Sequence, residues 1–115
     1  MTSRGFALLN GSAVAGNVKV GLYDRLGRLV AESASTAQSG TAAFQRINWT
    51  KSINLTPGTY YVGVTFDNTG ARFRAHPFGN FGATKATGLA YGTLPKTISP
   101  PTTFTTNLAP VGGLF

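Results

Sequence analysis

Apolar and polar residues alternate with a period of two along several short stretches of the chain, the pattern of half-buried β-strands. The clearest stretch is 17–23, whose core face would carry Val18, Val20 and Leu22. A turn follows, because Asp24 can accept backbone N–H groups and Gly27 can take the positive φ of a bulged hairpin. Residues 28–33 are therefore predicted to return antiparallel to 17–23.

The same period recurs further along the chain. Residues 44–49 alternate, and 59–66 alternate after a Pro-Gly turn signal at 54–58. A second turn signal at 67–70 predicts that 71–75 returns as the next strand. The predicted core consists of the apolar residues on the inner faces of these strands: Val18, Val20, Leu22, Val30, Ile47, Tyr60, Val62, Val64 and Phe66.

No window of the chain shows helical spacing of apolar residues without a Gly or Pro interrupting it. The pattern predicts one all-β domain over 1–115, an antiparallel β-sandwich of the jelly-roll or immunoglobulin-like kind with about six to eight short strands. Residues 1–13 and 97–115 have no such pattern and are expected to be extended arms. Their apolar side chains would be exposed in a monomer and are expected to join copies into a homo-oligomer: Phe6, Leu8, Leu9, Leu114 and Phe115.

The ionisable residues restrict the chemistry that the chain can perform. It has 10 Lys and Arg but only 3 Asp and Glu, 1 His and no Cys, with a net charge of +7. Nucleophile–base pairs, paired carboxylates and zinc sites need more such groups than this. We therefore expect no enzyme, no cofactor and no metal site. No apolar run is long enough to insert into a membrane.

Two groups of residues are candidate binding sites. Arg72, Arg74 and His76 form the one local cluster of cations between aromatics, which predicts contact with an anionic surface. Nucleic acid is not the expected partner, because no recognised nucleic-acid-binding module accompanies the charge. The second group is a possible aromatic platform for a ligand such as a host surface glycan: Trp49, Tyr61, Phe78 and Phe81.

Parts of the sequence resemble a β-sandwich module that is common in bacteriophage virion proteins. The resemblance lies in residues 15–24, 27–31 and 55–62, and in the Thr- and Pro-rich stretches 93–104 and 109–111. Such modules have further strands before the equivalent of Val18. Here one strand from 4–9 is expected, with a sheet edge that pairs with a neighbouring subunit.

The resemblance implies a non-enzymatic structural protein on the outer surface of a phage capsid or tail. It would be a decoration protein or a short-fibre component, with other virion proteins as partners and the virion as its location. The alternative is a carbohydrate- or receptor-binding module of a phage adhesin. The resemblance implies no catalytic residue.

Overall fold

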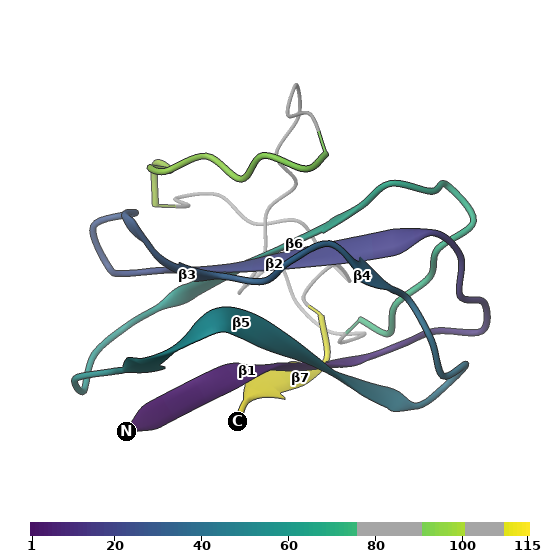
Figure 1. The fold of residues 1–115 in the computed structure, drawn as a ribbon, viewed down its shortest axis with the longest axis horizontal. Coiled ribbons are helices and arrows are strands. Elements are labelled where there is room, and N and C mark those ends of the chain that lie inside the picture. The colour runs from purple at the N-terminus through teal and green to yellow at the C-terminus, as the bar shows by residue number, and fades with distance from the viewer. Residues whose placement is uncertain (76–90, 101–109) are drawn as a thin grey trace.

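The structure is a computed structural model and describes residues 1–75, 91–100 and 110–115. These residues form strands and loops without a helix, and the strands make two antiparallel sheets (Figure 1). The predicted all-β sandwich is therefore confirmed. The strands are β1 (Thr2–Leu9), β2 (Asn17–Tyr23), β3 (Leu29–Glu32), β4 (Thr36–Ala37), β5 (Phe44–Asn54), β6 (Tyr61–Phe66) and β7 (Gly112–Leu114).

The first sheet has the order β5-β1-β7, and the second is built on β2, which pairs with β3, β4 and β6. The β2–β3 hairpin forms as predicted: the Asp24 carboxylate accepts the N–H groups of Leu26 and Arg28, and Gly27 has φ +85°. Asp24 thus satisfies the turn's backbone donors, and glycine takes the conformation that other residues avoid.

The core lies between the two sheets. Leu8, Val18, Val20, Leu22 and Ile47 have no exposed surface, and Phe6, Trp49 and Leu55 complete the buried cluster. Most of the predicted core is confirmed, with Val30, Tyr60, Val64 and Phe66 partly buried against this cluster. The prediction for Val62 is wrong, since 37% of that residue is exposed. Val62 shares a face with its β2 partner Leu22, but β6 pairs only with β2 and lies at the side of its sheet.

Residues 1–13 are not an arm, contrary to the prediction. β1 is the central strand of its sheet, and Phe6 and Leu8 are core residues at 5% and 0% exposure. The end of the chain belongs to the same sheet, because Leu114 of β7 pairs with Phe6. Short-range patterning missed this because the apolar residues of 1–13 find their partners about 40 and 110 positions away in the chain.

Residues 91–100 lie across the outer side of the second sheet, above β2 and β3 in Figure 1. Tyr23 donates to the carbonyl of Pro95 at 2.7 Å, and the Ile98 N–H donates to the Gly27 carbonyl at 2.7 Å. Burial, and then the Glu32 carboxylate, raise the pKa of Tyr23, so its hydroxyl stays a neutral donor. Residues 91–100 therefore cover the second face of β2, and 97–100 of the predicted C-terminal arm pack on their own domain.

Acid is expected to destabilise the fold through two turn carboxylates. Hydrogen bonds from the Arg28 N–H to Asp24, and from the Asn17 N–H to Asp67, hold the pKa of each carboxyl below its usual range. The folded state therefore binds these protons more weakly than the unfolded state does. The stability that they contribute is present above the unfolded-state pKa of about 3.9 and is lost as the pH falls through the lower folded values.

Urea unfolding between about pH 5 and pH 2 measures this effect. The Asp24→Asn, Asp67→Asn double variant should show a flatter dependence of unfolding free energy on pH than the parent chain. Equal slopes for the two proteins would contradict the assignment of the pH dependence to these turns.

Candidate docking face

The charges of the described residues are divided unequally between the two sheets. All three carboxylates belong to the β2 sheet and its turns: Asp24, Glu32 and Asp67. Asp24 pairs with Arg28 at 2.8 Å, and Glu32 lies 3.9 Å from Lys19. No Asp or Glu side chain lies on the β5-β1-β7 sheet, so its arginines have no acidic side chain within the sheet to neutralise them.

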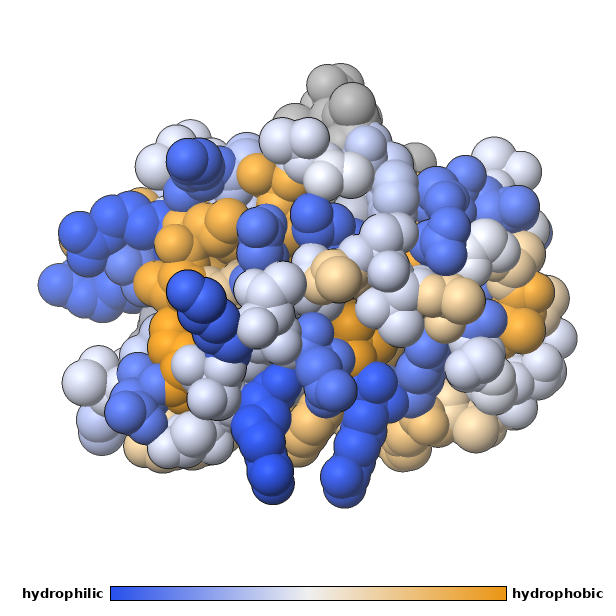
Figure 2. Space-filling view, in the orientation of Figure 1, coloured by the Kyte–Doolittle hydropathy of each residue, from blue (hydrophilic) through white to orange (hydrophobic). Residues whose placement is uncertain are grey.

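Strand register places three arginines on the outer face of the β5-β1-β7 sheet. Arg46 of β5 is opposite Ala7 of β1, with its side chain away from the buried Ile47. Arg4 is exposed on β1 between two buried neighbours. Arg74 donates its N–H to Leu9, beside the bridge between Asn10 and Phe73, and is exposed while Phe73 packs on the core. Figure 2 shows strongly hydrophilic side chains projecting beneath this layer.

The prediction that 71–75 returns beside 59–66 is wrong. Because of this error, the contact between Arg74 and Leu9 of β1 was not predicted. The chain crosses to the other sheet after the 67–70 turn, where Arg74 receives a hydrogen bond from Val111. Inside the sandwich, the ring of Phe73 stacks on Phe66 at 5.7 Å between centroids. Partial burial of the two stacked rings favours this crossing.

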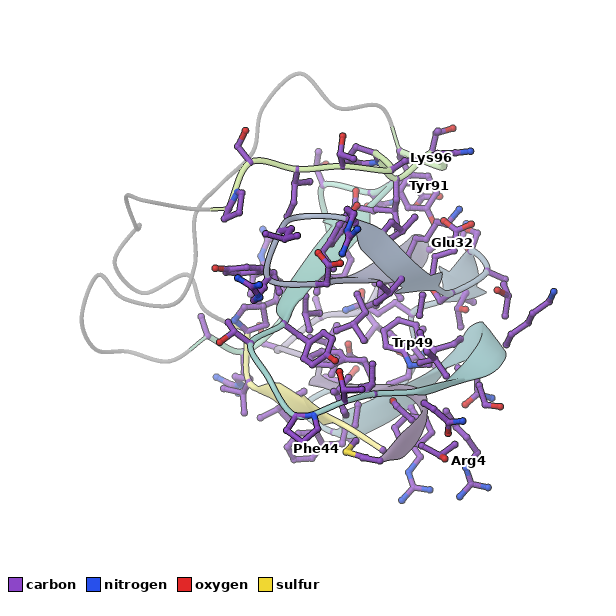
Figure 3. All side chains as sticks on the ribbon, turned by 90° about the vertical axis from the view of Figure 1, so that its left-hand side faces the viewer. Arg4, Glu32, Phe44, Trp49, Tyr91 and Lys96 are labelled. Atoms are coloured by element: carbon purple, nitrogen blue, oxygen red, sulfur yellow. The ribbon has the colours of Figure 1, made fainter. Side chains whose placement is uncertain are left out.

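An exposed apolar cluster occupies one end of this face. Phe44, 61% exposed, is opposite Leu9 in the β1–β5 register, and Leu9 donates its N–H to Val111. Leu9 and Val111 are half-buried. We call Phe44, Leu9, Val111 and the adjoining Arg74 the Phe44 patch. Figure 3 shows Phe44 and Arg4 on the outer side of this layer, with Trp49 between the two layers.

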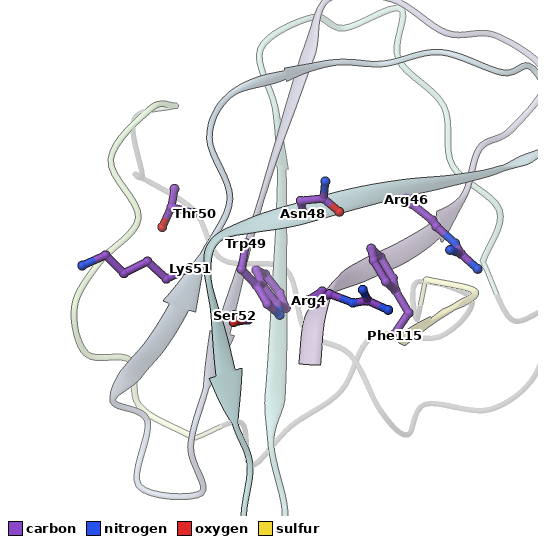
Figure 4. A pocket seen from close by; sticks show the side chains of 8 residues that line it. All are labelled: Arg4, Arg46, Asn48, Trp49, Thr50, Lys51, Ser52 and Phe115. Carbon is purple, nitrogen blue, oxygen red and sulfur yellow. The ribbon is translucent and has the colours of Figure 1, made fainter. Parts of the chain in front are cut away.

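A shallow, open hollow of about 550 Å³ lies on the same sheet (Figure 4). Its shape comes from an irregularity in β5: between the pairs Ser3–Ile53 and Gly5–Asn48, β5 has four residues and β1 has one. The lining residues are Arg4, Arg46, Asn48, Trp49, Thr50, Lys51, Ser52 and Phe115. We call this surface the arginine hollow.

Phe115 forms the floor of the hollow between the two arginines. Its carbonyl oxygen accepts the Arg4 N–H at 2.6 Å, and the Arg46 guanidinium lies 5.0 Å from the centre of its ring. The ring reaches this position because Gly5 has no side chain: a Cβ there would lie 2.6 Å from the ring and would also meet the Ile47 carbonyl. Cation–π contact with Arg46 holds the guanidinium over the ring.

The predicted aromatic platform does not form around Trp49. Only 5% of Trp49 is exposed, and its indole N–H donates to the buried Ser3 hydroxyl at 3.0 Å. A large aromatic side chain with its one polar group satisfied inside is a core residue, and no sugar ring can stack on it. Tyr61 is half-buried on β6. Phe78 and Phe81 lie outside the described residues.

The structure describes two of the three residues that were predicted to contact an anionic surface. Arg72 and Arg74 are both exposed, and the Arg72 guanidinium donates to the carbonyls of Thr69 and Ala71. Arg72 is thus partly engaged in its own turn, whereas the Arg74 side chain makes no hydrogen bond within the described part of the chain. His76 lies outside that part. Arg4, Arg46 and Phe44 were missed by the sequence analysis, because each is an isolated polar or aromatic residue until the strands pair.

A cluster of three or more metal-ligating side chains is not found within 1–75, 91–100 and 110–115. In the same ranges, no helix has the length and apolarity to cross a membrane. Comparison of the chain with protein-family models, with curated proteins and with solved structures gave no match in any of the three. The geometry of the docking face is therefore the basis for the function proposed below.

Proposed function

We propose that this chain is a non-enzymatic structural protein of a bacteriophage virion, positioned on the outer surface of the capsid or tail. In this proposal the Phe44 patch docks on an acidic surface of another virion protein. The observation that carries it is the exposed Phe44 beside half-buried Leu9 and Val111, with Arg46 and Arg74 nearby. Aromatic and arginine side chains are the residue types enriched at the centres of protein interfaces.

Charge supports the same partner. The face carries Arg4, Arg46 and Arg74 without an Asp or Glu side chain, so an acidic surface would be attracted and other copies of this face would be repelled. The resemblance of 15–24, 27–31 and 55–62 to phage virion modules supplies the setting. The arm residues Phe6 and Leu8 take no part in docking, because they are buried in their own domain.

The virion proposal is tested on phage particles from the source of the sequence. An antibody raised against the recombinant chain should label the particles in electron micrographs, and the chain should co-purify with them. A chain that is missing from purified particles would refute the location.

Docking through the Phe44 patch is tested by rebinding labelled chain to stripped particles over a salt series. Phe44→Ser combined with Arg74→Ala should weaken rebinding at least about tenfold. Wild-type binding should fall as salt rises, because exposed charges are screened beyond about 8 Å at physiological ionic strength. The matched control is Leu26→Ser with Arg25→Ala, which removes an exposed apolar residue and a cation from the β2–β3 turn. Equal weakening by both pairs would exclude the patch as the docking site.

A carbohydrate-binding module remains the second candidate for the whole protein. Burial of Trp49 removes one member of the platform on which that prediction depended. A saccharide on this chain would have to be held by charge and hydrogen bonds instead of by ring stacking.

A further inference from the structure

The two arginines of the arginine hollow are available to an external anion. The ion pairs among the described residues join Lys19 to Glu32 and Arg28 to Asp24, so neither Arg4 nor Arg46 has a carboxylate partner there. Both side chains extend on the same side of β5, around Phe115 (Figure 4). A guanidinium is a planar fork that binds carboxylate, sulfate or phosphate oxygens with two parallel hydrogen bonds.

Uncharged polar groups stand beside the arginines. Asn48 and Ser52 line the hollow, and their side chains take part in none of the hydrogen bonds within residues 1–75, 91–100 and 110–115. Both are exposed, and Ser52 belongs to the irregular part of β5, where Thr50 and Lys51 point away from the arginines (Figure 4). Free amide and hydroxyl groups next to two cations suit a ligand that carries both hydroxyl and acidic groups.

The geometry disfavours two other classes of anionic ligand. Single-stranded nucleic acid stacks its bases on free aromatic faces, but the Arg46 guanidinium covers one face of the Phe115 ring and the Cζ atom of the ring lies against Gly5. An extended acidic peptide gains its affinity by adding to a free strand edge. Arg46 and Asn48 of the hollow lie on the outer face of β5, so a ligand between them contacts a sheet face and not a strand edge.

We propose that the arginine hollow binds an acidic oligosaccharide, with Arg4 and Arg46 on its carboxylate or sulfate groups and Asn48 and Ser52 on its hydroxyls. A volume of about 550 Å³ is within the range of small-ligand sites. Arg4 and Arg46 also contribute to the charge of the docking face, but the hollow contains no residue of the Phe44 patch, so variants of the hollow and of the patch distinguish sugar binding from virion docking.

Calorimetric titration of the full chain at physiological salt tests the ligand class. The probes are a heparin-derived hexasaccharide for sulfate, a hexagalacturonate for carboxylate and maltohexaose as the neutral sugar. At least one acidic sugar should bind about tenfold or more tightly than maltohexaose, hexaglutamate and a thymidine hexanucleotide. Acidic sugars that bind no tighter than hexaglutamate or the hexanucleotide, or that do not bind, would overturn the proposal.

Variants of the hollow test its location. Arg4→Gln and Asn48→Ala change exposed side chains and should each weaken binding of the acidic sugar several-fold, while circular dichroism and thermal unfolding stay as in the parent. Arg25→Gln removes the same charge from the β2–β3 turn and should leave the affinity unchanged. If Arg25→Gln weakens binding as much as Arg4→Gln, or if Asn48→Ala has no effect, binding depends on net charge alone and the assigned site is wrong.

Discussion

Replacement of Leu22 by alanine is expected to lower the free energy of unfolding by about 2–5 kcal/mol. Leu22 lies in the middle of the core with no exposed surface, and its neighbours come from both sheets. The substitution removes buried methyl groups and leaves a cavity that a sandwich held together by two hydrogen-bonded sheets closes only in part. Equilibrium unfolding in urea measures the loss.

Val62→Ala is the matched control for this change. Val62 is the cross-strand partner of Leu22 and shares its face, but it is 37% exposed. Its truncation should cost less than about 1 kcal/mol, since only part of the side chain leaves a buried environment. A loss for Val62→Ala equal to that for Leu22→Ala would mean that the core extends beyond the edge of β6, contrary to the structure.

The second large effect is expected from Asn10→Asp, at about 3–5 kcal/mol. Asn10 is completely buried, and its amide nitrogen donates to the Ser39 carbonyl at 2.6 Å and to the Gln45 side-chain oxygen at 3.1 Å. Its side-chain oxygen accepts from Gln38 at 2.9 Å. Aspartate has nearly the same shape but turns a second oxygen toward the Ser39 and Gln45 acceptors, and of these partners only Gln38 can donate to the buried charge.

Asn68→Asp provides the control for the same chemical change on the surface. Asn68 is exposed, and its side-chain oxygen accepts the Gly70 N–H at 2.7 Å. An aspartate oxygen accepts that bond equally well, so we expect a change within about 0.5 kcal/mol in urea unfolding. A small loss for Asn10→Asp as well would show that the loops around Gln38 open to water in solution.

The buried amides also illustrate a limit of sequence reasoning. Asn10 and Gln38 are polar residues in stretches that look like loops, and nothing in their neighbourhoods predicts burial. They are buried because β1 and the segments at 38–45 and 72 converge at one end of the sandwich, where their backbone groups need partners. Each bond joins residues about 23 to 35 positions apart, a separation that local patterns do not report.

The candidate sites also depend on contacts between residues that are far apart in the chain. Arg74 was identified from its sequence cluster, but its proximity to Leu9 and Val111 depends on a crossing between sheets. Trp49 shares a face of β5 with the predicted core residue Ile47, and that face points into the core, where no ligand reaches the indole. Phe44 and Arg46 became candidates only when the β1–β5 register placed them on the outer face.

Alternation by itself determined the strands β2 and β3, the turn between them and the inner faces of β2 and β5, because these depend on neighbouring residues and on a side-chain period of two. The tertiary structure alone decided that β1 is central, that 72–75 joins it and that 91–100 covers β2. Those contacts link distant segments, and they are selected by the burial of apolar faces and the pairing of backbone groups over the whole domain. The docking face and the arginine hollow depend on these contacts between distant segments.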